Sequence, residues 1–336
     1  MLDKMKKCAR NILPLPLYGS VQKTWRTARG ALRRLATLLR SRSGIVGRLV
    51  RYPVPMSAPW RRSSLDIGRS GALGDVLMCT PALRELKIRN PAAYVRFYTN
   101  YPTLVRGLPY IDEIHTYEDR PKDTIILGYE DVIPPRAHLA KIMGDNLGLK
   151  VNNVRPDCNI DANIVRRFQD SWRLLPRPYI VVQKRASRWT PNKDWPEEYW
   201  INLIERLSQN ASVIEIGDDR SAQNISSANY IDLRAQTSLE ELVGLIAASD
   251  MLVGPVSGTT HIAAAFGIPA VVIVGGYEHP KNAAYAGHKS FYTAVSCAPC
   301  WLREACPHSL KCLRAIEPYQ VESAVRTIWT NRKPSY

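Results

Sequence analysis

The segment from Gly68 to Asp75 combines a glycine-containing turn with a carboxylate. An apolar run precedes it and a helical pattern follows it, so Gly71 and Gly74 stand where a strand turns into a helix. Backbone amides in such a turn can face a ligand, and Asp75 at the helix entrance can accept a proton from a hydroxyl group. The plain alternative is that Asp75 only caps the helix. The glycine spacing does not decide between the two.

A second turn has the composition of an anion-binding helix start and consists of Ser257, Gly258, Thr259, Thr260 and His261. The N-terminal amides of the helix that follows can receive a diphosphate, and His261 can add a hydrogen-bond donor. The alternative is a buried core histidine preceded by Thr260 as a helix cap.

Lys193 follows a loop that also contains Lys184, Arg185 and Arg188. The loop comes after a predicted strand, where a lysine can meet a phosphate as a point charge. The alternative is a solvated lysine.

Four cysteines gather near the end of the sequence, at Cys297, Cys300, Cys306 and Cys312. Four thiols within 16 residues are compatible with a tetrahedral zinc or iron site. A site with four thiolate ligands has no open position, so the metal would be structural and catalysis would not require it. The alternative is a loop with free thiols.

Strand and helix patterns alternate around these residues. A proline-rich joint at 53–59 precedes them, and Pro176 and Pro178 divide them into halves at 63–175 and 176–336. This alternation predicts an α/β fold with a parallel sheet in each half and a ligand cleft beyond the carboxyl ends of the strands. We expect strands at 65–68, 94–98, 111–115, 124–127, 179–183, 213–217, 251–253 and 270–274, and helices at 75–89, 137–147, 196–207 and 239–248.

The net charge of +16 is concentrated at the N-terminus. Residues 1–62 contain 15 Lys and Arg against one acid, whereas the rest of the chain contains 31 against 29. The body is therefore nearly neutral, which argues against a basic nucleic-acid-binding fold. We call residues 1–62 the leader. Helical spacing within it predicts a basic amphipathic helix that adsorbs to an anionic membrane surface. The alternatives are an oligomer seam, a poorly ordered tail or a transit peptide. The apolar positions of this helix are Trp25, Ala28, Leu32, Leu35 and Leu39.

The stretch from Met251 to Tyr277 contains no charged side chain. Pro255, Pro269 and the polar turn between them divide it into strand, turn, short helix and strand, so we do not expect a membrane span. Residues 1–20 lack the pattern of a secretory signal. We therefore expect a cytoplasmic protein, whose cysteines form no disulfide framework.

In this order, over about 250 residues, the motifs resemble the heptosyltransferase-like glycosyltransferases that build the lipopolysaccharide core. The resemblance rests on the turn that ends at Asp75 and on a small set of further segments. These are Thr80 to Leu83, Pro109 to Ile114, Lys193 to Pro196, Ser257 to His261, Cys297 to Cys312 and Ile316 to Pro318.

This resemblance implies a GT-B fold, with two Rossmann-like domains on either side of a cleft. It further implies an inverting transfer of heptose or a similar sugar from an ADP-sugar to a glycolipid acceptor at the inner face of the bacterial cytoplasmic membrane. Asp75 would be the general base, Lys193 would hold donor phosphate, and the turn from Ser257 to His261 would hold the diphosphate. Some protein-modifying members look similar in having a cysteine-bound iron.

One departure from the family pattern concerns the donor turn, where Val256 stands in place of the usual Asp. This departure removes one polar contact, so either the sugar or nucleotide differs or the site is weakened.

The alternatives to glycolipid glycosylation are transfer to protein serines and, from another class of protein, a non-catalytic GT-B scaffold or nucleotide-binding partner. Nucleic-acid binding by the leader is the weakest hypothesis. The sequence does not determine the oligomeric state.

Overall fold

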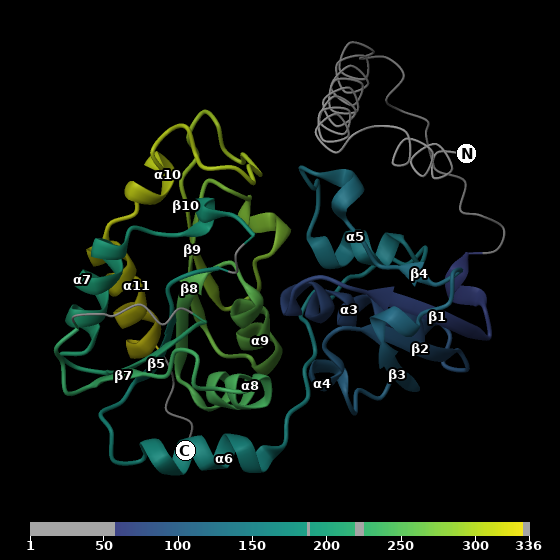
Figure 1. Ribbon diagram of the computed structural model, residues 1–336, viewed down its shortest axis with the longest axis horizontal. Helices are drawn as coiled ribbons and strands as arrows, with labels where there is room; N and C mark the ends of the chain where they lie inside the picture. Colours follow the sequence, from purple (N-terminus) through teal and green to yellow (C-terminus); the bar gives the residue numbers. More distant parts are fainter. Residues whose placement is uncertain (1–57, 187–188, 219–224, 332–336) are drawn as a thin grey trace, which may run out of the picture. The chain divides into compact units, whose positions relative to one another are not determined.

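The computed structural model describes residues 58–186, 189–218 and 225–331. These residues belong to one compact unit, Met56–Tyr336, and form an α/β structure with two sheets (Figure 1). The fold class expected from the sequence is thus confirmed, whereas the domain boundaries at residues 62 and 175 stay predictions. Most of the leader, including its proposed amphipathic helix, lies outside the described residues. Its last part contains the 3-10 helix η1 (Pro59–Arg61).

The first sheet has four strands in the order β3-β2-β1-β4, and all of its pairings are parallel. Alternate residues of β1 and β2, such as Leu65, Ile67, Val95 and Phe97, are buried against helix α3. The elements are β1 (Ser64–Arg69), α3 (Leu73–Arg89), β2 (Tyr94–Thr99), α4 (Pro102–Val105), β3 (Glu113–Thr116), η2 (Tyr117–Asp119), β4 (Ile125–Ile126), η3 (Glu130–Val132) and α5 (Leu139–Asp145).

Helix α3 contains Pro81 in its interior, where a proline removes one backbone hydrogen bond. The carbonyl left without that bond belongs to Leu77, and the Thr80 hydroxyl donates to it at 2.7 Å. Thr80 also accepts a hydrogen bond from the backbone N–H of Asp157 at 2.8 Å. The Thr-Pro pair therefore satisfies the interrupted turn and ties α3 to the segment that leads to the second sheet.

The second sheet has six strands in the order β10-β9-β8-β5-β6-β7, again with parallel pairings throughout. Helices α7 and α11 cover one face, and α8 and α9 cover the other (Figure 1). The elements are α6 (Ala162–Trp172), β5 (Tyr179–Gln183), η4 (Pro191–Lys193), α7 (Glu197–Leu207), β6 (Ser212–Ile216), β7 (Tyr230–Asp232), α8 (Leu239–Ala248), β8 (Met251–Pro255), α9 (Gly258–Phe266), β9 (Ala270–Gly275), η5 (Pro280–Asn282), β10 (His288–Tyr292), α10 (Lys311–Arg314) and α11 (Pro318–Thr330).

The two sheet regions meet where the first turn of α3 packs on the first turn of α9. A Cβ atom at Gly74 would lie 2.7 Å from His261 Cδ2 and 3.3 Å from Gly258 Cα. One at Gly258 would lie 2.1 Å from a methyl carbon of Leu73. Both glycines therefore leave room for this close approach, and a Cβ atom at either one would force His261 or Leu73 to shift.

A second contact between the sheet regions is formed around Tyr285, which three histidine rings surround. His138 comes from the first region, and His261 and His288 come from the second. The ring centroids of His138, His261 and His288 lie 5.3, 5.5 and 5.6 Å from that of Tyr285. Its hydroxyl is hydrogen-bonded to His261 Nδ1 at 2.6 Å. Burial lowers the pKa of His138 and His288 to about 4 and that of His261 to about 3, so all three rings are neutral near pH 7.

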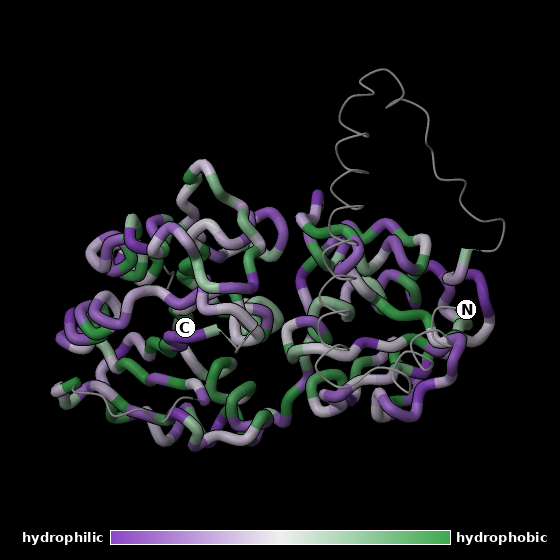
Figure 2. The backbone as a smooth tube through the Cα atoms, turned by 45° about the horizontal axis from the view of Figure 1, so that its top comes forward, coloured by the Kyte–Doolittle hydropathy of each residue, from purple (hydrophilic) through white to green (hydrophobic). Residues whose placement is uncertain are grey.

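The uncharged stretch from Met251 to Tyr277 folds as β8, α9 and β9, as predicted. None of the helices in the described part of the chain has the length and apolar character needed to cross a bilayer. Along the described chain, hydrophobic residues occur in short stretches interrupted by hydrophilic ones (Figure 2).

The buried histidines predict that stability falls as the pH drops. At pH values above 6.5 these rings are neutral in both the folded and the unfolded chain. Between about 6.5 and 4 only the unfolded chain gains their protons, so the free energy of unfolding decreases with decreasing pH. Replacing His288 by Gln is expected to flatten this slope by up to about 1 kcal/mol per pH unit in urea unfolding. The exposed His308→Gln serves as the matched control, and equal slopes for both variants would contradict the assignment.

Candidate active site

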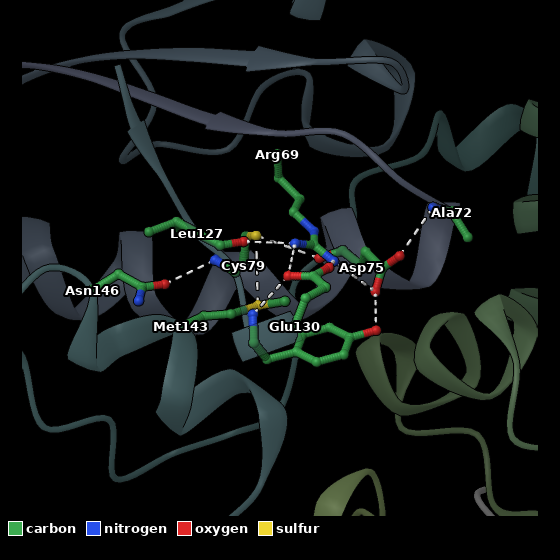
Figure 3. A network of polar contacts seen from close by, with 10 residues as sticks. Arg69, Ala72, Asp75, Cys79, Leu127, Glu130, Met143 and Asn146 are labelled. Atoms are coloured by element: carbon green, nitrogen blue, oxygen red, sulfur yellow. Dashed lines mark hydrogen bonds and ion pairs between the residues drawn. The ribbon is translucent and has the colours of Figure 1, made fainter. Parts of the chain in front are cut away.

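Asp75 lies in the first turn of α3, just beyond the carboxyl end of β1, with 15% of its side chain exposed. Oδ2 accepts a hydrogen bond from the backbone N–H of Ala72 at 3.0 Å, and Oδ1 accepts one from the Tyr129 hydroxyl at 2.9 Å. Oδ1 also lies 3.2 Å from a guanidinium nitrogen of Arg69 (Figure 3). These three partners fix the direction of the carboxylate.

Arg69 ends β1 and is only 4% exposed. Its guanidinium donates to the Leu127 carbonyl at 3.1 Å and to the two carboxylate oxygens of Glu130 at 3.2 and 2.7 Å (Figure 3). Burial acts to lower the pKa of Arg69, but the hydrogen bond to Glu130 and the charge of Asp75 raise it overall. The sequence analysis missed Arg69, Tyr129 and Glu130. The one local signal was an arginine at the buried end of a strand, at the start of the glycine turn.

The glycine turn brings the chain close to this carboxylate. Gly71 has a φ of +112°, and a Cβ atom there would lie 2.6 Å from Asp75 Oδ2. A side chain at Gly71 would therefore displace the carboxylate as well as strain the backbone. The two predicted glycines have different roles: Gly71 makes room for Asp75, and Gly74 makes room for α9.

The predicted donor turn forms the N-terminus of α9, with Ser257 as the N-cap residue. The Thr260 hydroxyl accepts a hydrogen bond from the Ser257 backbone N–H at 3.2 Å and donates to the Ser257 carbonyl at 2.7 Å. The Ser257 hydroxyl donates to Gln183 Oε1 at 2.6 Å, and the Thr259 hydroxyl donates to the same oxygen. Gln183 ends the neighbouring strand β5 and is a residue that the sequence analysis missed. The first turn of α9 is thus held in place at the carboxyl end of the sheet, where an anion would meet it.

Lys193 ends the 3-10 helix η4 and points to the same edge of the sheet. Its ammonium nitrogen lies 3.4 Å from the carbonyl oxygen of Val256 and 2.5 Å from Glu278 Oε1. The same nitrogen lies 4.9 Å from the centre of the Tyr277 ring. The structure therefore brings Lys193 next to the Ser257 turn and gives it an acidic partner.

His261 is 3% exposed and packs on Gly74, with Nδ1 paired to Tyr285. It joins the first turns of α9 and α3. This position resembles that of a buried core histidine, which the sequence analysis gave as the alternative to a histidine that donates a hydrogen bond to the diphosphate.

Three of the four cysteines lie in the segment between β10 and α10, whereas Cys312 lies in α10, and none of the four is paired in a disulfide. Backbone N–H groups of Cys300 and Trp301 donate to the carbonyls of Gly276 and Tyr277 at 3.1 and 3.0 Å, so this segment supports the loop after β9. Within residues 58–331, the described His, Cys, Asp and Glu side chains form no group of three or more that could hold a metal ion. The structural zinc or iron at Cys297, Cys300, Cys306 and Cys312 stays a prediction.

The family of the chain follows from a match to a protein-family model. The model for glycosyltransferase family 9 (heptosyltransferase) matches residues 135–308, just over half of the sequence. The chain belongs to glycosyltransferase family 9. The match includes Lys193, the Ser257 turn and most of the cysteine segment, whereas Asp75 lies before it.

Two curated relatives of this family 9 chain are heptosyltransferases. Lipopolysaccharide heptosyltransferase 1 of Salmonella typhimurium is 24% identical over 127 residues, which are 36% of this chain and 39% of the relative. Lipooligosaccharide heptosyltransferase 2 of Campylobacter jejuni is 22% identical over 178 residues, 49% of this chain and 56% of the relative. The chain thus aligns with about two fifths to just over half of these relatives' length.

Solved structures agree with the family in fold. A glycosyltransferase family 9 protein from Veillonella parvula superposes with a TM-score of 0.62 at 15% identity, covering 80% of this chain and 97% of that one. ADP-heptose lipopolysaccharide heptosyltransferase II of Escherichia coli superposes with a TM-score of 0.60 at 17% identity, covering 80% and 98%. The two parallel sheets therefore form a GT-B-like fold, as the resemblance implied.

Proposed function

We propose that this family 9 glycosyltransferase transfers a heptose or a similar sugar from an ADP-sugar to a hydroxyl group of a lipopolysaccharide-type glycolipid, with inversion at the anomeric carbon. The observation that carries the proposal is the packing of α3 on α9. It places the carboxylate of Asp75 and the donor turn from Ser257 to His261 at adjoining helix N-termini. A base for the acceptor and a binding surface for the departing diphosphate are the two parts that the reaction needs.

On the acceptor side, Asp75 takes the proton of the attacking hydroxyl as the new glycosidic bond forms. Arg69 and Tyr129 both contact the carboxylate and leave it little rotational freedom. A carboxylate oriented in advance avoids part of the entropy cost of reaching the transition state. Arg69 and Tyr129 therefore act as positioning residues for Asp75.

On the donor side, the bond between the anomeric carbon and the diphosphate breaks, and negative charge develops on the leaving oxygen. The first turn of α9 offers the positive end of its helix dipole to this charge, and Lys193 adds an ammonium group. Gln183 keeps that turn in place through Ser257 and Thr259.

Replacing Asp75 by Asn tests the base. The amide keeps the size of the side chain but cannot accept the proton, so we expect kcat to fall by about 10²- to 10⁴-fold with ADP binding retained. The measurement is turnover with an ADP-heptose donor together with calorimetric titration of ADP. The exposed Asp123→Asn is the matched control. Normal turnover by the Asp75 variant would remove this residue from the base role.

The nucleotide is tested by thermal stabilisation with ADP, GDP, UDP, CDP and dTDP. We expect the largest increase in Tm with ADP, because a ligand that binds only the folded state raises stability with its concentration. Lys193→Ala is expected to lose most of this increase relative to its own ligand-free Tm. A larger increase in Tm with another nucleoside diphosphate would mean that the donor sugar carries that nucleotide. No increase with any of them would favour the non-catalytic scaffold.

The proposal also includes a glycolipid acceptor and a location at the inner face of the bacterial cytoplasmic membrane. A basic leader suits a lipid-linked acceptor, since each Lys or Arg near an anionic surface contributes about 1 kcal/mol of attraction. We expect the full chain to float with anionic liposomes and not with neutral ones, and removal of residues 1–62 to abolish flotation. Equal flotation with and without the leader would rule out membrane binding through residues 1–62, and failure of the full chain to float would favour transfer to protein serines.

A further inference from the structure

Lys193 and Glu278 form a buried ion pair at the donor edge of the second sheet. Glu278 is 3% exposed, 16% of the Lys193 side chain is exposed, and the two charged groups lie 2.5 Å apart. Lys193 arrives from the η4 turn, whereas Glu278 follows the end of β9. A carboxylate is kept this far from water only where an opposite charge compensates it.

Three groups surround the ammonium of Lys193 and fix its position. Besides the Glu278 carboxylate these are the Val256 carbonyl at 3.4 Å and the Tyr277 ring at 4.9 Å. The indole N–H of Trp189 donates to the Tyr277 hydroxyl at 2.9 Å and so orients that ring. A lysine side chain that lacks such contacts loses considerable rotamer entropy when it binds a phosphate in one fixed geometry.

Glu278 and Val256 lie beside the same space. Both residues line one small pocket, together with Thr260 of the donor turn. The Val256 carbonyl lies 3.4 Å from the Lys193 ammonium, so residue 256 is a direct neighbour of that charge. Of these two neighbours of Lys193, position 278 has a carboxylate and position 256 has none.

We propose that Glu278 is the positioning residue that holds Lys193 against the donor diphosphate, and that it supplies from the loop after β9 the negative charge that Val256 does not provide. This inference rests on the proposed function, because it assigns a role within the same donor site. The ligand class is a nucleoside diphosphate. Its phosphates would share the ammonium with Glu278, so the lysine is already in place when the donor binds.

Moving the carboxylate tests the proposal. Glu278→Gln keeps the shape of the side chain and removes its charge, and we expect the Kd for ADP and the donor KM to rise about 10-fold with little change in the acceptor KM. Adding Val256→Asp to that variant returns a carboxylate to the pocket and is expected to restore the Kd to within about threefold of the parent. Val256→Asp alone places two carboxylates around one lysine, so ADP binding is expected to weaken.

The measurements are calorimetric ADP binding and steady-state kinetics on the full chain, with the exposed Glu304→Gln as the matched control. A merely structural role for Glu278 would change Tm but would not give a donor-specific KM effect that Val256→Asp reverses. Should Glu278→Gln not fold, Glu278→Asp retains the charge one methylene further from Lys193, and we expect it to weaken ADP binding as well.

The possible failures are distinguishable. If the parent chain binds ADP and Glu278→Gln binds it equally well, or if Val256→Asp fails to rescue a folded Glu278→Gln, the role of Glu278 is wrong and the proposed function stands. If the parent chain binds no nucleoside diphosphate, the proposed function is wrong and the role of Glu278 with it.

Discussion

The close contact between the first turns of α3 and α9 is the constraint on which the candidate site depends. Each helix follows a strand of a different sheet, so each N-terminus lies at the carboxyl end of its own sheet. Gly74 and Gly258 let the two backbones approach, and Leu73 and His261 fill the space that remains. A side chain at either glycine would force His261 or Leu73 out of this contact. The local sequence of both turns therefore serves a contact between distant parts of the chain.

Ion pairs with at least one buried partner form on both sides of this contact, and they have one physical feature in common. Arg69 is shared between Asp75 and Glu130, and Lys193 is paired with Glu278. Such pairs contribute little net stability, because desolvation of the buried group offsets much of the attraction. They do restrict where a charged group lies. Near a reacting centre this restriction favours catalysis, since groups that are already oriented need not reorganise in the transition state.

Local patterns were sufficient to predict much of the fold. Helix α8 begins at Ser238 with a capping box to Glu241, and helix α7 has two glutamates in its first turn, so both starts were readable in the sequence. Helix α6 was missed because few of its residues are buried, and β7 and β10 were missed because they are short or half-exposed edge strands. In the site, Asp75 and the Ser257 turn belong to local motifs. Their partners Tyr129, Gln183 and Glu278 come from distant segments, and no spacing rule connects them.

The departure at Val256 shows why the distant partners matter. In the sequence, the absence of an acid at this position suggested either a weakened site or a different donor. In the structure, Glu278 lines the same small pocket as Val256, and Lys193 has Glu278 as an acidic partner. The loop that contains Glu278 is in turn supported by backbone hydrogen bonds from Cys300 and Trp301. The charge around a lysine therefore depends on distant segments as well as on its own motif, because a lysine responds to the charge near it and not to the position in the sequence that supplies it.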